Sequence, residues 1–506
     1  MSKREINQNQ FHWIILIIIM LIGIAIRLYD LQDPPLDFHP ARQLHSAMIA
    51  RGEYARLNED AYPGPERALI AAQWASELRI EPPIIEIITS RLFYLFNTDE
   101  LWIARLLSIF FWVVGGFGLY FLVRNLSGVP GALFAVAFYM ILPYGVIASR
   151  SFQPDPLMVA LMIYSFLFYL RWSEKKSWKS AIWAGVLGGS AILVKQVAIF
   201  FLAAAGLMIV FSEMGIKDSL KNAQAWLVAG LTLLPSLVYN LFGIFVDGSL
   251  LGQYSKRFFP EMLIDPGFYI RWSRLADMVI PLEFILLSLV GILLLESRKS
   301  RLFGVSLFAG YIFLGLGLSH HISTHDYYHL PLIPLVAVGL APVFELILKE
   351  LNRRLNRISV VFSLSIILLG GGALNLYESY STLKKADYRD QPETWPHLVE
   401  LMGGYNAVSI GLYEDYGASQ IYYGYNYPLV YPSLGDIKFT DIEDNTVKTE
   451  NIEFRMQDRS FFVVTDFEEL NQQPDLKAYL VNNYALIESG DWYQIYHIRE
   501  EINAPE

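Results

Sequence analysis

Four apolar runs in this chain are long enough, or nearly long enough, to cross a lipid bilayer as helices, and they constrain the fold more than any other feature. The runs are 11–26, 101–123, 223–245 and 359–376. A helix needs about 20 mainly apolar residues to span the hydrocarbon core. The composition agrees, because 54% of the residues are hydrophobic and only 17% are charged, which is unusual for a soluble domain. The sequence therefore predicts a mainly α-helical, polytopic membrane protein.

Shorter apolar runs raise the expected number of membrane-spanning helices to about eleven. The spans are 11–29, 101–123, 129–147, 155–171, 180–194, 197–212, 223–244, 280–295, 303–318, 329–347 and 358–377. No cleavage site follows the first span, so we interpret it as an uncleaved anchor. On one side the loops hold sixteen Lys and Arg residues, whereas the short turns on the other side hold only Arg150 and Lys195. Since positive residues favour the cytoplasmic side, we expect the N-terminus inside and the C-terminus outside.

Three of the expected outer segments are long, and the first covers residues 30–100. Its apolar spacing predicts amphipathic helices in the membrane interface at about 40–51, 66–78 and 84–96. The second segment, 245–279, is rich in aromatic and basic residues. The third is the tail that follows the last span.

The tail has a composition of its own, with 22 acidic and nine basic residues in 379–506. Short β-like runs at 407–413, 460–465, 485–488 and 493–498 alternate with helix-like runs at 415–423 and 476–484. We therefore expect two domains, a membrane domain at 1–378 and a small extracytoplasmic α/β domain at 379–506. The tail has no chemical motif, so we expect it to dock or present an acceptor. The chain has no cysteine, so the tail folds without disulfides.

Unusual polar residues gather at the expected outer ends of the spans. They are Asp37, His39, Arg42 and His45 after the first span, Glu81 and Glu86 before the second, Arg150, Gln153 and Asp155 before the fourth, Lys195 between the fifth and sixth, and His320, His321, His325, Asp326 and His329 before the tenth. Taken singly, Arg150 or Lys195 would be interpreted as a snorkelling interfacial side chain. Charged groups near membrane depth are costly and tend to mark functional sites. Their convergence on one side predicts a cavity that opens outward.

Short motifs in these segments follow one another in a recognisable order. They are Asp37 after the first span, Pro82-Pro83 before the second, Ala104-Arg105-Leu106 opening the second, Arg150-Ser-Phe-Gln-Pro-Asp155 opening the fourth, and Asp326-Tyr-Tyr-His-Leu-Pro331 opening the tenth. This order, over about residues 11–350, resembles the GT-C superfamily of membrane glycosyltransferases. It is most similar to the branch with the protein O-mannosyltransferases and the aminoarabinose transferase of lipid A.

The resemblance implies an enzyme that moves a sugar from a polyprenyl-phosphate carrier to a hydroxyl of a protein, lipid or glycan, with inversion at the anomeric carbon. Asp37 matches the family's base, and a carboxylate can remove the proton of the attacking hydroxyl. The phosphate leaving group calls for fixed cations. Outer cations with few other roles are Arg150 and Lys195, with Arg42 and Arg271 as further candidates. Substrate contacts are expected from Glu81, Gln153, Asp155, His325, Asp326 and Tyr328.

Two positions depart from the family pattern. Phe38 stands where members often have a second acid, and Glu81 stands where the aminoarabinose branch has lysine. Glu81 either binds a sugar hydroxyl or pairs with Arg79. We expect no required cofactor, but His321, His325 and His329 are spaced i,i+4 and on a helix would share one face suited to a divalent metal.

Other function classes remain as alternatives. A transporter or lipid flippase would also need an outward cavity, but transporters tend to have repeated halves and broken helices, and no repeat is evident. A sensory or scaffold protein would leave the polar residues unexplained. The absence of cysteine and of a Lys-Asp-Glu-Leu-type signal favours a bacterial inner membrane, with no nucleic-acid partner. The sugar and the acceptor stay open.

Overall fold

The chain forms two compact units. The computed structural model describes residues 3–78, 81–251, 259–435 and 452–498. The membrane unit comprises Met1–Gln32, Leu78–Thr89 and Trp102–Ala386, and the sheet unit comprises Asp33–Glu77, Ser90–Leu101 and Asp387–Glu506. Helix α4 (Ile84–Phe96) contributes residues to both.

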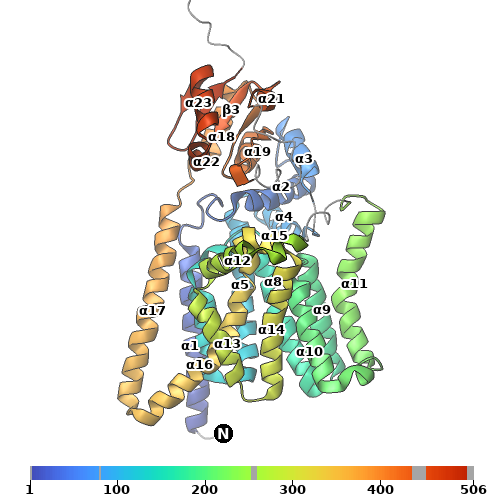
Figure 1. The fold of residues 1–506 in the computed structure, drawn as a ribbon, viewed down its shortest axis with the longest axis vertical. Helices are drawn as coiled ribbons and strands as arrows, with labels where there is room; N and C mark the ends of the chain where they lie inside the picture. Colours follow the sequence, from blue (N-terminus) through green and yellow to red (C-terminus); the bar gives the residue numbers. More distant parts are fainter. Residues whose placement is uncertain (1–2, 79–80, 252–258, 436–451, 499–506) are drawn as a thin grey trace, which may run out of the picture. The chain divides into compact units, whose positions relative to one another are not determined.

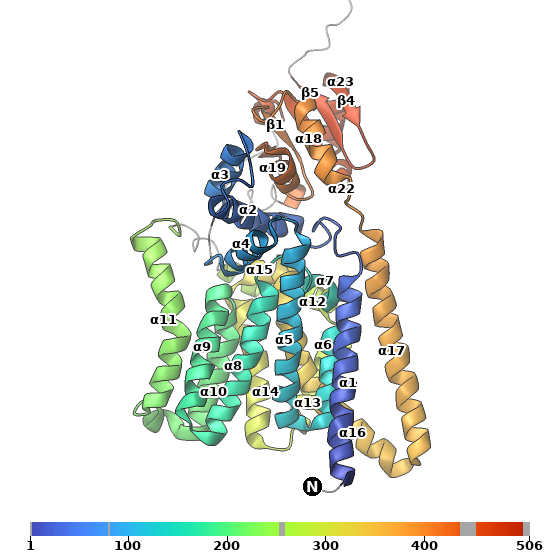
Figure 2. The same cartoon turned by 180° about the vertical axis from the view of Figure 1, so that it is seen from behind.

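The membrane unit is entirely helical over its described residues (Figures 1 and 2). Its helices are α1 (Lys3–Leu28), α5 (Trp102–Ser127), α6 (Val129–Ile141), α7 (Pro143–Ala148), α8 (Asp155–Lys175), α9 (Trp178–Val194), α10 (Ala198–Ser219), α11 (Ala223–Phe245), η1 (Pro260–Ile264), α12 (Pro266–Val279), α13 (Leu282–Leu294), α14 (Arg298–Gly317), α15 (Ser319–Thr324), η2 (Asp326–His329), α16 (Leu332–Arg354) and α17 (Arg357–Lys385). Each of the eleven predicted spans coincides with one of these helices or, for 129–147, with the pair α6 and α7.

Length and composition separate these helices into two groups. Within the described residues, seven are long and apolar enough to cross a membrane, or eight if the bent pair α12 and α13 is one span. Helices α6 and α9, and the part of α10 up to Ser212, are apolar but shorter. The bend between α12 and α13 is 89°. The predicted polytopic, mainly helical membrane protein is confirmed.

Capping residues explain where several of these helices begin. The side chains of Ser177, Asn222, Ser297 and Asn356 each accept a hydrogen bond from the backbone N–H three residues later, at the starts of α9, α11, α14 and α17. Such caps satisfy N–H groups that have no partner within the helix.

Small residues let α13 and α16 approach each other closely. A Cβ added at Gly291 would clash with the backbone oxygen of Gly339, and one added at Gly339 would clash with the backbone oxygen of Ser288. Close packing at small residues is a main source of helix association in membranes.

Gly291→Ala is therefore expected to destabilise the membrane unit by about 1–3 kcal/mol, the usual cost of overpacking. The midpoint of thermal unfolding in detergent measures this. The matched control is Gly370→Ala in α17, where an added Cβ meets nothing within 4 Å. Equal shifts for the two variants would contradict the packing argument.

The sheet unit surrounds one five-stranded sheet. Its strands are β1 (Ser409–Leu412), β2 (Leu429–Val430), β3 (Phe461–Val464), β4 (Ala485–Ser489) and β5 (Gln494–His497), in the order β2-β1-β3-β5-β4. Strand β1 is parallel to β2 and β3, and β5 is antiparallel to β3 and β4. The four predicted β-like runs are confirmed, whereas the two-residue β2 was not predicted.

Both faces of this sheet are covered. Phe462 and Val464 of β3 pack in one core with Ile410, and Val463 packs in a second core with Trp395. A strand buried on both faces is apolar without alternation, as the sequence Phe-Phe-Val-Val shows. The helices that pack against the sheet are α18 (Gln391–Leu401), α19 (Ala418–Gly424), α21 (Ile452–Met456), α22 (Phe467–Gln472) and α23 (Pro474–Asn483). Helix α2 (Pro40–Leu57) packs on α19 and on α3 (Glu66–Ser76). Helices α2, α3 and α4 confirm that the first long segment contains three helices, and their location in the membrane interface stays a prediction.

Candidate active site

A buried guanidinium ties the turn before α8 to the end of α1. Arg150 is 1% exposed, and its Nη1 and Nη2 donate to the backbone oxygens of Tyr29 at 2.8 Å and Asp30 at 2.7 Å. The premise that Arg150 has few other roles is therefore wrong, because two of its N–H groups hold the backbone. Its role in donor binding stays a prediction.

A second buried guanidinium supports the same turn. Arg27, at the end of α1, is fully buried and donates to Ser149 Oγ at 2.7 Å and to the backbone oxygens of Met140 at 2.7 Å and Gly145 at 3.2 Å. A buried guanidinium is stable only when its N–H groups are satisfied, and these acceptors supply that. The segment that carries Gln153 and Asp155 is consequently fixed at its start.

Lys195 and Asp155 form a buried ion pair. The Lys195 Nζ donates to Asp155 Oδ1 at 2.7 Å and Oδ2 at 2.9 Å, and their side chains are only 2% and 3% exposed. The same Nζ lies 4.6 Å from the centre of the Tyr327 ring and 5.1 Å from that of Tyr328. Here too the premise of few other roles is wrong, since Asp155, 40 residues away, is the partner of Lys195.

Tyr328 also joins the Lys195 pair to the histidine segment. Its ring centre lies 5.4 Å from that of His321 and 6.1 Å from that of His325, and these two imidazoles stack at 5.8 Å. Burial lowers the pKa of the neighbouring His320. Aromatic and imidazole groups of this kind suit contacts with sugar rings and hydroxyls.

The continuous helix that the metal alternative requires is not present between His321 and His329. Helix α15 ends at Thr324, and His325 has an extended backbone before η2 begins. His329 is fully buried, with Nδ1 2.6 Å from the Tyr311 hydroxyl and Nε2 2.9 Å from the Ile322 oxygen, so both ring nitrogens are used. Within the part of the chain that the structure describes, no three His, Asp or Glu side chains are placed to hold a metal ion.

Gln153 is the most unusual polar side chain in the turn before α8. It is fully buried, yet neither its amide nitrogen nor its amide oxygen has a hydrogen-bond partner among the described residues. An unsatisfied buried amide costs about 1–3 kcal/mol per group. Such a cost is typical of a position where a bound substrate forms the hydrogen bonds that the free protein lacks.

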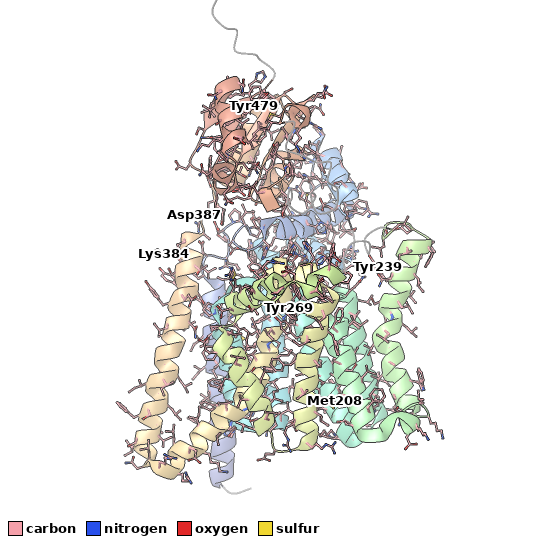
Figure 3. The ribbon with its side chains drawn as sticks, in the orientation of Figure 1. Met208, Tyr239, Tyr269, Lys384, Asp387 and Tyr479 are labelled. Carbon is pink, nitrogen blue, oxygen red and sulfur yellow. The ribbon has the colours of Figure 1, made fainter. Side chains whose placement is uncertain are left out.

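The remaining candidates of the membrane unit lie near its surface. Arg271 on α12 is half-exposed and pairs with Asp265 at 3.2 Å; Tyr269, two residues before it, is labelled in Figure 3. Glu81 is partly buried, and its suggested partner Arg79 lies outside the described residues. Asp326 begins η2.

Asp37 and Arg42 lie in the sheet unit, whereas Arg150, Lys195 and Arg271 lie in the membrane unit. Asp37 is partly buried and lies three residues before α2, and Arg42 is in the first turn of that helix. The meeting of the base with the phosphate-binding groups therefore stays a prediction.

Comparison with known proteins identifies the fold. Residues 80–240 match the model of the dolichyl-phosphate-mannose-protein mannosyltransferase family. The structure of ArnT from Cupriavidus metallidurans bound to undecaprenyl phosphate is similar with a TM-score of 0.54 and 14% identity, covering 98% of this chain and 99% of that one. The chain has the fold of a GT-C membrane glycosyltransferase.

A second solved structure agrees. The oligosaccharyltransferase AglB from Archaeoglobus fulgidus, in complex with an inhibitory peptide and a dolichol-phosphate, has a TM-score of 0.57 and 12% identity, covering 98% of this chain and 75% of that one. No curated protein matched the chain. The predicted GT-C fold is confirmed.

Three residues with informative contacts were not among the predicted site residues. Arg27 was not predicted, because a cation at the end of an apolar run is usually interpreted as a snorkelling interfacial side chain. Tyr327 was passed over beside Tyr328, although its ring is the nearer one to Lys195. Tyr388 of the sheet unit gave no signal, because Asp33, which accepts a hydrogen bond from its backbone N–H, is 355 residues away in the sequence.

Proposed function

We propose that the chain transfers a sugar from a polyprenyl-phosphate carrier to an acceptor hydroxyl, with inversion at the anomeric carbon. The observation that carries this is the GT-C fold over 98% of the chain. The mannosyltransferase family match covers Glu81, Arg150, Gln153, Asp155 and Lys195. The bound lipids of the two solved neighbours, undecaprenyl phosphate and dolichol-phosphate, are both polyprenyl phosphates, which supports this carrier class.

Asp37 is the proposed general base. A single displacement opposite the phosphate inverts the anomeric centre, and it needs one carboxylate to take the proton of the attacking hydroxyl. Asp37 follows the first span, as the family's base does, and its neighbour Phe38 cannot share the proton. The side chain is only partly buried, so an incoming hydroxyl has access to it.

Lys195 is the proposed cation for the leaving phosphate. Asp155 holds the ammonium in one place, and the rings of Tyr327 and Tyr328 lie close to it. A cation that is already fixed costs no reorganisation when charge grows on the phosphate oxygen. Arg271, which is half-exposed, and Arg42 are the further proposed cations for the single phosphate of the donor. His325, Asp326, Tyr328 and Glu81 are the proposed contacts for sugar and acceptor hydroxyls.

Gln153 is proposed to complete its hydrogen bonds with the donor. Gln153→Leu keeps a similar volume, so the free protein is expected to keep or gain thermal stability because an unsatisfied buried amide is removed. Transfer is expected to fall at least about tenfold, because leucine cannot form the hydrogen bonds proposed between the Gln153 amide and the donor, and donor binding is therefore weaker. Rates at several donor concentrations, alongside the unfolding midpoint, measure both effects.

Gln224→Leu is the matched control for Gln153→Leu. Gln224 Oε1 accepts from Trp172 Nε1 at 2.8 Å, so this variant should lose stability and keep transfer. If Gln153→Leu instead lost stability and kept transfer, the donor contact would be wrong.

We propose that the protein lies in a bacterial inner membrane with its site on the outer face. The Lys and Arg bias of the loops favours an N-terminus in the cytoplasm. Mass spectrometry of glycans, glycoproteins and lipids from source cells with and without this chain tests the function. Loss of one glycoconjugate, restored by the wild-type chain, is expected. Unchanged glycoconjugates with a redistributed carrier lipid would favour a flippase instead.

A further inference from the structure

Asp33, four residues before Asp37, is bound by residues of the C-terminal tail. Asp33 is 4% exposed, and its Oδ1 accepts a hydrogen bond from the backbone N–H of Tyr388 at 2.9 Å. Arg389 Nη1 lies 3.8 Å from the same oxygen and donates to Asp387 Oδ1 at 2.7 Å. Asp387 is labelled in Figure 3 just after the end of α17. All of these residues belong to the sheet unit.

Helix α2, which follows Asp37, is also hydrogen-bonded to the tail. Arg51 of α2 is buried, and its Nη2 donates to the backbone oxygen of Tyr422 in α19 at 2.8 Å and to Gln73 Oε1 at 2.6 Å. Its guanidinium carbon lies 3.8 Å from the centre of the Tyr422 ring. In turn, Gln73 donates to the backbone oxygen of Ile421. Helix α2 therefore has a fixed position on α19.

The backbone between these two anchors has little freedom. Pro34 and Pro35 restrict φ, and the N–H of Leu36 bonds back to the Pro34 oxygen at 2.7 Å. His39 takes a left-handed conformation with φ 48° just before α2. The fully buried Gln43 donates from Nε2 to the Phe38 oxygen at 2.7 Å. Asp37 is thus held between restrained neighbours.

The Tyr388 side chain lies among the acids of this region. Burial raises the pKa of Tyr388, and the carboxylates of Asp37, Glu414 and Asp33 raise it further. The tail residue whose backbone binds Asp33 is therefore also an electrostatic neighbour of Asp37.

We propose that the C-terminal tail positions the Asp37 carboxylate, through the Asp33–Tyr388 hydrogen bond before it and the Arg51–Tyr422 contacts after it. This inference rests on the proposed role of Asp37 as the base. It assigns the tail a part in turnover that lies beyond docking or presenting an acceptor, and it makes Asp33 a positioning residue. A misplacement of about 1 Å can cost roughly 10²-fold in rate, so the contact has a measurable effect.

The test compares Asp33→Ala with Asp33→Asn in the full-length chain. Alanine removes the acceptor for the Tyr388 N–H, whereas the asparagine amide oxygen keeps it. Three quantities are measured: hydrogen exchange of the backbone amides of 36–44, affinity for undecaprenyl phosphate, and the initial transfer rate in membrane vesicles from source cells, which supply donor and acceptor. Asp387→Asn, which removes the negative charge of the exposed second partner of Arg389, is the matched control.

Asp33→Ala is expected to speed exchange in 36–44 and to slow transfer about 10- to 100-fold, with affinity for undecaprenyl phosphate within twofold. Asp33→Asn and Asp387→Asn should stay within about threefold of wild type in transfer, as expected for a retained hydrogen bond and for an exposed pair. The double variant Asp33→Ala/Asp37→Asn should be no slower than Asp37→Asn, because contacts that act through one group are not additive.

Equal rates of transfer and of hydrogen exchange in Asp33→Ala and wild type would overturn the inference. It would also be overturned if Asp33→Ala slowed transfer in the Asp37→Asn background by the same factor as in wild type. A parallel loss of undecaprenyl phosphate binding would show a general structural role and would also overturn it. Wild-type transfer in Asp37→Asn would overturn the proposed base itself, and the inference with it.

Discussion

Asp37→Asn is expected to lower the rate of sugar transfer by about 10²- to 10⁴-fold, the usual contribution of a positioned general base. Asparagine has nearly the same shape but cannot accept the proton of the acceptor hydroxyl. The loss should appear at saturating donor, because the proposed contacts for the donor phosphate belong to residues other than Asp37. Initial rates in vesicles and binding of undecaprenyl phosphate to the purified variant measure the two effects separately.

The matched control for Asp37→Asn is Asp60→Asn, an exposed acid in the same segment of the sequence, which should transfer at the wild-type rate. Asp37→Glu keeps a carboxylate on a longer side chain and should fall between the two. Near-normal transfer by Asp37→Asn would contradict the base assignment.

Lys195→Met is expected to have the second largest effect, and this effect is on stability. It leaves the buried Asp155 carboxylate without its partner at 2.7 Å. Removing one member of a buried ion pair costs about 3–5 kcal/mol, because the remaining charge is buried and uncompensated. The midpoint of thermal unfolding in detergent should fall clearly, and transfer should be lost.

The double variant Lys195→Met/Asp155→Leu separates stability from function. Replacing both members of a buried pair by apolar residues is often neutral or stabilising, so the unfolding midpoint should return toward wild type. If Lys195 meets the leaving phosphate, transfer stays lost in this refolded double variant. Recovery of transfer together with stability would assign Lys195 and Asp155 a purely structural role.

The sequence was a good guide to the helices and strands because their signals are local. The apolar residues of 101–123 and the sequence Phe-Phe-Val-Val each indicate a buried element without reference to distant residues. These segments form α5 and β3. The two-residue β2 was missed because Leu429 and Val430 are too short a run to carry any periodicity. Its place is set by pairing with Ile410 and Gly411 of β1.

The polar contacts were harder to predict, because each depends on residues far apart in the sequence. Lys195 looked like an isolated cation, yet its partner Asp155 precedes it by 40 residues. Arg51 finds the Tyr422 oxygen 371 residues later. No spacing rule reports such pairs. What the sequence did indicate was the kind of residue: ionisable groups at the ends of apolar helices, where burial is costly and a partner is needed.

The histidine segment shows a second limit. A spacing of i,i+4 predicts a shared face only if the helix continues, and Thr324 ends it. The Thr324 hydroxyl is hydrogen-bonded to the His320 oxygen at 2.7 Å, and such side-chain bonds compete with helical backbone bonds. The metal alternative failed for His329 because Tyr311 and Ile322 already occupy its two ring nitrogens.

The most direct test of the central claim is the turnover of defined donors by the purified chain. Undecaprenyl-phosphate esters of mannose, glucose and aminoarabinose are supplied with an extract of source-cell acceptors, and the product is analysed by NMR for its anomeric configuration. The account predicts release of undecaprenyl phosphate from one of these donors, with the configuration of the sugar inverted in the product. A product with retained configuration would contradict it.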